Sequence, residues 1–437
     1  MRLWRVDVKR RILVIGQCTL HWGRMEFGNI GNFYIIDPFF KELRRVFPDS
    51  EIATTMQFSD EFCKKYNIET LPMEIYYDFM RSDNLENAVG ELNAVIHGND
   101  IDSRYVDEIK KADLVIDFSG DIWGDNADFL GGDRFATGCY KDLIAQHLKP
   151  TVMVAGSPGP FKNPETLELA KRVYNGFDLV TNREPISTRL LAEQGFNLSK
   201  TQNYPCPSFL FEKAGFEEVK KVVQNDILFS EDDIKVGIIM CGWNFERGPF
   251  DAWPRDDSEY EKIVNMACKL MDNRDVHVFL ISHANGFDIP PKPFVLKHGR
   301  DFPIMKQMKR IFDESGYGKS VTLLEGVYSP EITKGIVSYL DILISGRMHG
   351  AVAGISQSIP TMIIDYGHEP KAHKLRGFAE VSGIENFIAN PNNEIELIDT
   401  SFRCYNNRKQ IRNMLQERMV DVKNAAKKQF DLLGDLI

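Results

Sequence analysis

The chain has 437 residues, of which 43% are hydrophobic and 27% are charged, and its formal net charge is −10. This composition is typical of a globular protein and excludes a disordered one, and the acidic balance argues against a dedicated nucleic-acid-binding protein. No window approaches the ~20 continuous apolar residues of a membrane span. At roughly 150 residues per domain, the length predicts two or three domains.

The cysteines and the start of the chain predict a cellular compartment. The first eleven residues lack the apolar core of a signal peptide. Seven cysteines, an odd and scattered set without a CxxC pair, are typical of free thiols in a reducing compartment. We therefore predict a cytoplasmic protein.

Short β-branched runs alternate with amphipathic segments through most of the chain, which predicts parallel βαβ units. In the first half we expect strands at residues 11–17, 51–55, 113–118, 151–155 and 177–181, with helices at 34–46, 103–111, 138–148, 165–174 and 185–193. In the second half we expect strands at 235–240, 276–282, 321–324, 341–345 and 361–364, with helices at 258–273, 302–315, 330–339, 348–356 and 371–381.

Between the two series lie a Pro-Cys-Pro segment and a charged stretch, which place a linker at 206–233. We expect an α/β protein with two Rossmann-like, doubly wound domains at 1–205 and 234–400 that face each other across a cleft.

A long helix is predicted at the end of the chain, over 401–437. Its apolar residues recur at steps of three or four and so share one face: Ile411, Leu415, Met419, Val422, Ala426, Phe430 and Leu433. This face either packs on the second domain alone or crosses back to the first.

Functional residues of doubly wound domains gather at the carboxyl ends of the strands. After the first strand comes a glycine loop that contains Gly28, Asn29 and Gly31 and precedes a helix, where free N–H groups favour anions. It lacks the GxGxxG pattern, so a plain turn is the alternative. A Ser-Gly-Asp turn ending at Asp121 follows the third strand.

Arg183 stands between a strand end and a helix start. A guanidinium there offers a planar fork to a carboxylate or phosphate. Pairing with Glu184 or another nearby acid is the alternative.

The strand at 341–345 leads through Ser345 into Gly-Arg-Met-His-Gly, which holds Arg347, His349 and Gly350. Histidine exchanges protons near neutral pH and arginine fixes anions without titrating, although a histidine at a helix start also serves as a cap or surface residue. A second cation-rich stretch, 365–377, follows the next strand. His368 and His373 are five residues apart, which suits no metal site on one helix face, and we expect no metal and no cofactor.

Five of these segments, in the same order, resemble the polysaccharide pyruvyl transferase family: 28–31, 156–161, 182–187, 345–349 and 366–377. The resemblance implies a fold like that of GT-B glycosyltransferases. It implies transfer of pyruvate from phosphoenolpyruvate to two hydroxyls of a sugar, as a cyclic ketal, in cell-surface polysaccharide biosynthesis.

The resemblance also assigns roles to residues. Arg183, Arg347 and His349 are similar to the donor-binding and catalytic positions of the family, and Lys374 matches the lysine of the family. On this basis we assign Arg347 and His349 as catalytic, with His349 as the general acid, and Arg183, Ser345, Lys374 and Gly350 as donor-binding. The loop with Gly28, Asn29 and Gly31, together with Asp121, would form an acceptor or anion subsite. Two departures from the family pattern, Asn32 in place of Asp and the Ser119-Gly120-Asp121 turn in place of three glycines, leave room for a divergent acceptor.

Two other functions remain open: a nucleotide-sugar glycosyltransferase of the same fold, and a catalytically silent partner in glycan assembly. The expected acceptor is a glycan or a lipid-linked oligosaccharide. Basic residues near the start, at positions 2, 5, 9, 10 and 11, either attract the anionic inner face of a membrane or form a solvated end.

Overall fold

The computed structural model describes residues 9–16, 25–120, 122–130, 133–248, 255–272, 275–288, 292–368 and 372–437. The chain forms two compact units. Unit 1 comprises Met1–Met25, Phe39–Cys206 and Lys427–Ile437, and unit 2 comprises Glu26–Pro38 and Pro207–Ala426. Each unit is built around its own parallel sheet.

Unit 1 contains a seven-stranded sheet of order β3-β2-β1-β4-β5-β6-β7, in which every neighbouring pair is parallel. The central strands β4 and β5 are buried along their whole length, as the mostly apolar strands of a parallel sheet covered by helices are expected to be. The strands are β1 Arg11–Ile15, β2 Glu51–Thr54, β3 Ile68–Thr70, β4 Leu114–Asp117, β5 Thr151–Gly156, β6 Leu179–Asn182 and β7 Thr201–Asn203.

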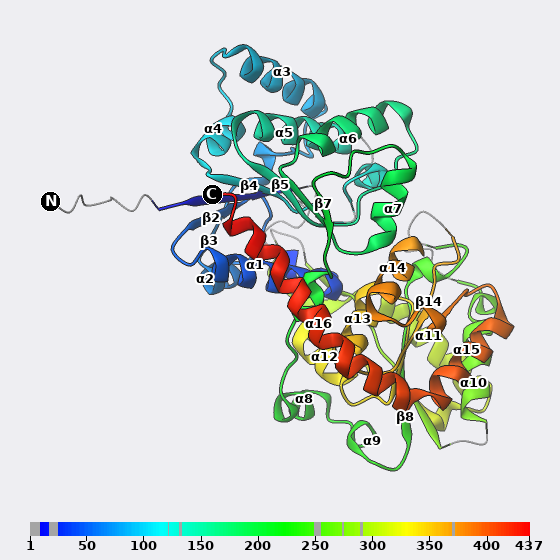
Figure 1. Cartoon of the computed structure of the whole chain (residues 1–437). Helices are drawn as coiled ribbons and strands as arrows, with labels where there is room; N and C mark the ends of the chain where they lie inside the picture. Colours follow the sequence, from blue (N-terminus) through cyan, green and yellow to red (C-terminus); the bar gives the residue numbers. More distant parts are fainter. Residues whose placement is uncertain are drawn as a thin grey trace. The chain divides into compact units, whose positions relative to one another are not determined.

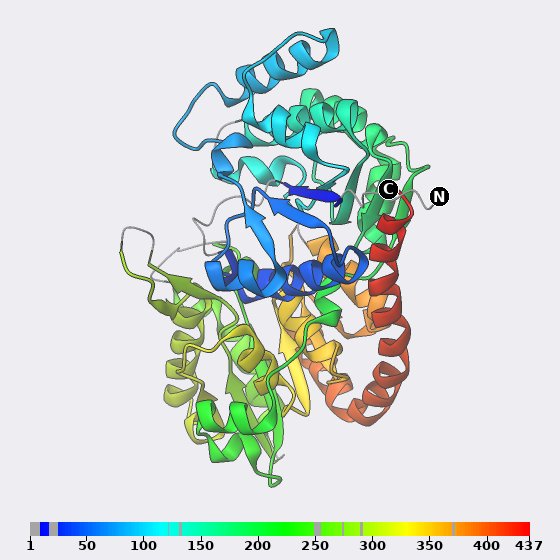
Figure 2. The same cartoon turned by 90° about the vertical axis from the view of Figure 1, so that its left-hand side faces the viewer.

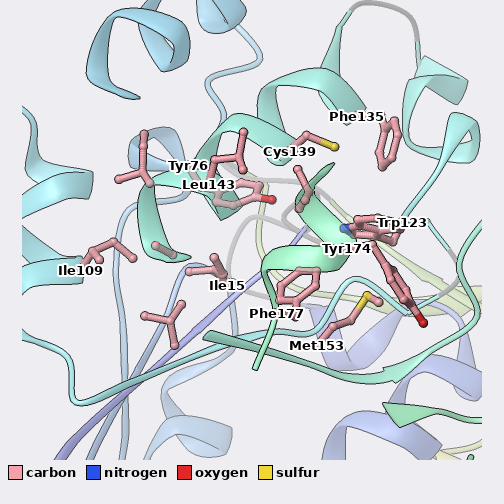
Figure 3. Packing of buried hydrophobic residues seen from close by; sticks show 14 of the residues in the cluster. Ile15, Tyr76, Ile109, Trp123, Phe135, Cys139, Leu143, Met153, Tyr174 and Phe177 are labelled. Carbon is pink, nitrogen blue, oxygen red and sulfur yellow. The ribbon is translucent and has the colours of Figure 1, made fainter. Parts of the chain in front are cut away.

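Helices surround this sheet (Figure 1). They are α2 Asp60–Tyr66, α3 Asn84–His97, α4 Arg104–Lys111, α5 Arg134–Leu148, α6 Pro164–Gly176 and α7 Pro185–Glu193. Several begin where the sequence supplies a cap: the side chains of Ser103 and Asn163 accept backbone N–H groups at the starts of α4 and α6. Trp123 and the aromatic rings around it fill the core beneath them (Figure 3).

Unit 2 contains a six-stranded parallel sheet of order β12-β9-β8-β13-β14-β15 and a small antiparallel hairpin, β10-β11. Its strands are β8 Ile234–Ile239, β9 Val276–Leu280, β10 Asn285–Phe287, β11 Leu296–His298, β12 Val321–Leu323, β13 Ile342–Ser345, β14 Thr361–Ile364 and β15 Ile388–Ala389. Its helices are α8 Phe216–Val223, α9 Asp226–Phe229, α10 Glu261–Met271, α11 Asp301–Glu314, α12 Pro330–Val337, α13 Met348–Ile355, α14 Ala372–Ser382 and α15 Glu394–Asn406.

Two helices contribute to both units. Helix α1, Ile30–Val46, is continuous and contains Pro38; its residues up to Pro38 belong to unit 2 and those from Phe39 belong to unit 1. Helix α16, Arg408–Gly434, divides after Ala426 and is drawn as one continuous helix in Figure 2. All seven apolar residues predicted to share its face are buried. Packing on the second domain alone is therefore wrong for α16, because residues 427–437 belong to unit 1.

The ten predicted strands and the eleven predicted helices correspond to elements of the structure, with ends shifted by a few residues. The long final helix begins at Arg408 rather than at 401, because residues up to Asn406 close α15. The stretch expected as linker includes α8 and α9. Helix α3 escaped prediction because its buried face is thin: Asn84, Ala88 and Leu92, about one residue per turn.

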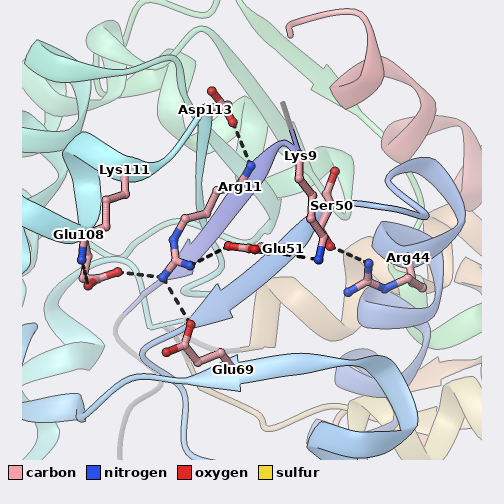
Figure 4. Close-up of polar contacts among 9 residues, drawn as sticks. All are labelled: Lys9, Arg11, Arg44, Ser50, Glu51, Glu69, Glu108, Lys111 and Asp113. Carbon is pink, nitrogen blue, oxygen red and sulfur yellow. Dashed lines mark hydrogen bonds and ion pairs between the residues drawn. The ribbon is translucent and has the colours of Figure 1, made fainter. Parts of the chain in front are cut away.

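The basic start of the chain is partly neutralised. The guanidinium of Arg11 lies 2.8 Å from Glu108, 3.2 Å from Glu51 and 3.3 Å from Glu69, so its charge is balanced by carboxylates of unit 1 (Figure 4). Arg2 and Arg5 lie outside the described residues. Across the ranges that the structure describes, we find no helix with the length and apolar character of a membrane span. The six cysteines in those ranges are free thiols.

Candidate functional site

The turn after β13 is organised by Ser345. Its buried hydroxyl donates to the carbonyl of Arg347 at 2.8 Å and accepts the backbone N–H of Arg347 at 3.2 Å. Gly350 lies beneath the same hydroxyl: an added Cβ would stand 2.7 Å from Ser345 Oγ. The two residues predicted to bind the donor therefore shape the turn that leads into α13.

Arg347 is held by a residue that the sequence analysis missed. Its Nε and Nη2 donate to the two carboxylate oxygens of Asp301 at 2.5 and 2.6 Å, and Asp301 is completely buried at the start of α11. Burial lowers the pKa of Arg347, but the Asp301 carboxylate outweighs it, so the net pKa lies above the ordinary value. The planar fork is thus directed at Asp301 rather than at a ligand.

His349 occupies the first turn of α13 and is almost fully buried. Gly31 of α1 lies directly against it, since a Cβ at position 31 would stand 2.8 Å from His349 Nδ1 and Cβ. On its other side the imidazole meets the ring of Phe378 edge to face at 5.9 Å. The ring is held between α1 and α14.

The glycine loop also belongs to unit 2, although the sequence placed it in the first domain. Asn29 pairs with Ala284 as an isolated bridge, and the carbonyl of Gly28 accepts the N–H of Asn285 at 3.2 Å. The Asn29 side chain accepts the N–H of Gly31 at 3.0 Å and so begins α1. The loop is thereby fixed beside the residues that follow β9.

Asn244 joins the ends of three strands, another feature that the sequence analysis missed. Its amide nitrogen donates to the carbonyls of Ile364 and Asp365 at the end of β14, at 3.3 and 3.2 Å. Its oxygen accepts the N–H of Cys241 after β8 at 2.9 Å. Gly346, after β13, packs against this side chain so closely that an added Cβ would stand 2.2 Å from its oxygen. An asparagine in a loop carries no sequence signal for such a role.

Lys374 lies on α14, which runs past His349. It is buried, and it precedes Phe378 by four residues, which places the two side chains on one face of the helix. Arg376 pairs with Asp365 at 3.1 Å. Within the cation-rich stretch at 365–377, Lys374 is therefore buried and Arg376 forms an ion pair. Its residues 369–371 lie outside the described ranges.

Arg183 belongs to unit 1, at the end of β6, and is only 1% exposed. Its Nε donates to the Ser157 hydroxyl at 2.8 Å, and its backbone N–H donates to Gly156. The carboxylate of Glu184 accepts the N–H and hydroxyl of Ser187 as the cap of α7. Glu184, the acid named as an alternative partner for Arg183, has a capping role.

A buried pair of carboxyl groups lies at the end of β4. Asp117 accepts the N–H and hydroxyl of Ser119 at 2.8 and 2.9 Å, and Asp142 accepts from Trp123 Nε1 at 3.3 Å. Burial raises the pKa of Asp117 to about 6 against the opposing bonds from Ser119. Burial and then the charge of Asp117 raise the pKa of Asp142 well above its ordinary value.

The structure thus places eight of the ten predicted site residues in unit 2: Gly28, Asn29, Gly31, Ser345, Arg347, His349, Gly350 and Lys374. Arg183 is in unit 1. Asp121 lies outside the described residues. Within the described ranges, no group of three or more potential metal ligands occurs.

Two parallel β-sheets, each flanked by helices, and a long final helix define a protein of the GT-B type, and solved structures agree. A glycosyltransferase from Rickettsia africae matches with a TM-score of 0.57 and 13% identity over 98% of each chain. HepE from Anabaena, in complex with UDP, matches with a TM-score of 0.57 and 12% identity over 97% of this chain and 98% of that one. At such identities the likeness shows the fold alone, and it confirms the predicted fold class.

The sequence match is more specific. The chain belongs to the polysaccharide pyruvyl transferase family, whose pattern it matches over residues 29–368. The amylovoran biosynthesis protein AmsJ from Erwinia amylovora is 22% identical over 381 residues, which cover 82% of this chain and 84% of the relative. The predicted family is confirmed, and with it a pyruvyltransferase role in polysaccharide synthesis. Lys374 lies beyond the matched range.

Proposed function

We propose that this chain transfers pyruvate from phosphoenolpyruvate to two hydroxyls of one sugar and releases phosphate. Family membership supports pyruvyl transfer over sugar transfer. One geometric observation carries the proposal: a histidine held by Gly31 and Phe378 stands two residues after an arginine fixed by a buried acid.

The proposed reaction begins with a proton transfer. Protonated His349 gives its proton to the methylene carbon of the donor, and C2 becomes electrophilic. A sugar hydroxyl attacks C2 and loses its proton, which returns to the His349 imidazole. Phosphate then departs with the electrons of its C–O bond, and the second hydroxyl closes the ketal as its proton leaves with the phosphate. A positioned acid contributes on the order of 10²–10⁴-fold to such a step.

The contacts of Arg347 refine its role. Because Asp301 occupies both prongs of the guanidinium, Arg347 offers a ligand only its remaining edge, and the pair carries almost no net charge. We therefore assign Arg347 to the support of the reacting centre. Arg183 and Lys374 are the proposed donor-binding cations, an assignment that rests on the family pattern.

The acceptor is proposed to be a glycan or lipid-linked oligosaccharide, as the relationship to an amylovoran biosynthesis protein supports. Cytoplasmic location, at the inner face of the membrane, is part of the same proposal. Phosphate release should be measured from phosphoenolpyruvate with galactose-, mannose- and glucose-containing acceptors. Acceptor-dependent release that survives a chelator is expected; sugar transfer from UDP-sugars with no release from phosphoenolpyruvate would refute the proposal.

His349→Gln tests the acid. Glutamine forms hydrogen bonds but delivers no proton at neutral pH, so single-turnover ketal formation should fall by about 10²-fold or more. Donor affinity, measured by calorimetry on the same variant, should change much less. Near-normal turnover would move the acid elsewhere, with His373 and His368 as the next candidates.

Arg183→Lys tests the donor site. Lysine keeps the positive charge but loses the two-pronged geometry, so the apparent KM for phosphoenolpyruvate should rise at least 10-fold, with a smaller change in kcat. Unchanged donor binding would make Arg183 a structural residue of the turn that contains Ser157.

A further inference from the structure

A second histidine of unit 2, His283, has no role in the proposed reaction. It follows β9 and is completely buried. Within the part of the chain that the structure describes, neither of its ring nitrogens has a hydrogen-bond partner. Buried polar atoms in folded proteins are nearly always bonded, so each exception requires a physical explanation.

His283 lies within the cluster that holds the proposed acid. Its ring meets Tyr34 of α1 edge to face at 5.3 Å, and its backbone N–H donates at 3.2 Å to Asp301, the acid that binds Arg347. Tyr34 is three residues after Gly31, the residue against His349, so the two histidines pack against neighbouring positions on one face of α1.

The surroundings of His283 determine its charge. Burial, followed by the charges of Arg347 and His349, lowers the pKa of the His283 imidazole well below its ordinary value. The ring is therefore neutral near pH 7 and carries one N–H donor and one acceptor nitrogen. A neutral donor suits an anionic oxygen without adding to the positive charge beside it.

The residues that interact electrostatically with His283 are the cap of α13, Arg347, and its second residue, His349. The first turn of a helix presents N–H groups without partners in the helix and a positive dipole end, which favour anions. Arg347 and His349 both reach the surface more than His283 does. A ligand at the first turn of α13 would therefore lie beside Arg347 and His349, the two residues whose charges act on His283.

We propose that His283 contacts the ligand, and that its N–H donates to a phosphate or carboxylate oxygen bound at the first turn of α13. In its assignment to phosphoenolpyruvate this inference rests on the proposed function. The hydrogen bond itself requires only an anionic ligand. His283 would thus fix an anionic group, while His349 carries the proton.

Replacement by phenylalanine separates this role from simple packing. Phenylalanine fills a similar volume without a polar atom to bury, so His283→Phe should keep or raise the Tm of the protein without ligand. The same variant should lose at least 10-fold in kcat/KM, and most of the Tm increase that ligand gives the wild type. A residue that only packs would show neither loss. His283→Gln, which restores an N–H donor, should recover part of both.

His277, on the strand β9 that precedes His283, provides a matched control. It is buried like His283, but its Nε2 bonds to the Thr322 hydroxyl at 2.8 Å. His277→Phe removes the hydrogen-bond partner of the Thr322 hydroxyl, so the Tm of this variant should fall. Its kcat/KM and its ligand-induced Tm shift should stay unchanged. The two variants are expected to change stability and function in opposite patterns.

The ligand probes are inorganic phosphate, phosphoenolpyruvate and UDP, each added separately to the full chain. If phosphate or UDP raises the wild-type Tm, phosphoenolpyruvate does not, and His283→Phe abolishes the shift, then His283 contacts an anion and the proposed donor is wrong. If His283→Phe keeps both the shift and turnover, or if none of the three anions shifts the wild type, the inference is overturned. If His283→Phe fails to fold, the imidazole NMR signal of His283 in the wild type decides, since anion binding must shift it.

Discussion

The two units place different pairs of buried ionisable groups at the ends of their central strands. In unit 2, Arg347 and Asp301 carry opposite charges and meet through two short hydrogen bonds. In unit 1, Asp117 and Asp142 would carry like charges if both ionised. The first pair is stable as ions, whereas the second is stable when it holds a proton.

This difference determines how each unit responds to change. Arg347 keeps its charge near neutral pH, so removal of Asp301 leaves that buried charge without its partner. The aspartate pair can take up a proton, so its effect on the free energy of unfolding depends on pH. In unit 2, the positive charge of Arg347 is thus always paired with Asp301. In unit 1, the turn at Ser119 is hydrogen-bonded to Asp117, which gains or loses a proton as the pH changes.

The largest effect is expected from Asp301→Ala. The variant leaves Arg347 buried without its carboxylate and removes the acceptor of the His283 N–H, so the free energy of unfolding should fall by about 3–5 kcal/mol. Turnover should be lost with it. Urea unfolding at neutral pH measures the first effect and phosphate release the second.

Two controls interpret that loss. Asp257→Ala removes an exposed partner of Arg310 and should change stability little. Combining Asp301→Leu with Arg347→Met removes both charges, so it should recover much of the stability but none of the turnover. If the single variant is no less stable than Asp257→Ala, Arg347 does not depend on Asp301.

The next effect concerns the aspartate pair and pH. The pKa of Asp117 is about 6 in the folded protein and 3.8 as the ordinary value, so the folded state holds the extra proton between these values. Stability from this group is therefore complete below about pH 4 and is lost as the pH rises through 6. A shift of this size corresponds to about 3 kcal/mol.

Asp117→Asn isolates this contribution, because the amide has the shape of the neutral acid and does not ionise. The variant should be close to the wild type near pH 4 and exceed it by up to about 3 kcal/mol near pH 7. The comparison requires urea unfolding of both proteins at several pH values. Parallel stability curves would mean that Asp117 does not hold a proton in the folded protein within this pH range.

Some residues at the strand ends could be predicted from the sequence and others could not. The turn with Ser345, Arg347 and His349 could be predicted because small residues, a strand and a helix start are neighbours in the sequence. Asp301 is 46 residues earlier and His283 is earlier still, and only the parallel order of β9, β8 and β13 brings them together. At the start of a predicted helix, a buried acid and an exposed one have the same sequence pattern.

The glycine loop illustrates a second limit. Its position before a helix predicted a ligand-facing turn in the first domain, but its bonds to Ala284 and Asn285 place it in unit 2. Helix α1 contributes to both units, and alternation of strands and helices assigns each helix to one sheet only. The close contact with His349, which explains the glycine at position 31, could be identified only from the structure.

The smallest effect on stability is expected at Gly31, where function should change more than folding. Alanine is favoured over glycine within a helix by about 1 kcal/mol, but here its Cβ would stand 2.8 Å from His349 Nδ1. The imidazole must move, so kcat should fall more than 10-fold, while overpacking costs only about 1–2 kcal/mol beyond the gain in propensity. Gly90→Ala is the matched control, because a Cβ at position 90 of α3 meets nothing within 4 Å. That variant should gain about 0.5–1 kcal/mol and keep full activity. If Gly31→Ala behaves like Gly90→Ala in both measurements, the position of His349 does not depend on α1, and its assignment as the acid loses the contact that supports it.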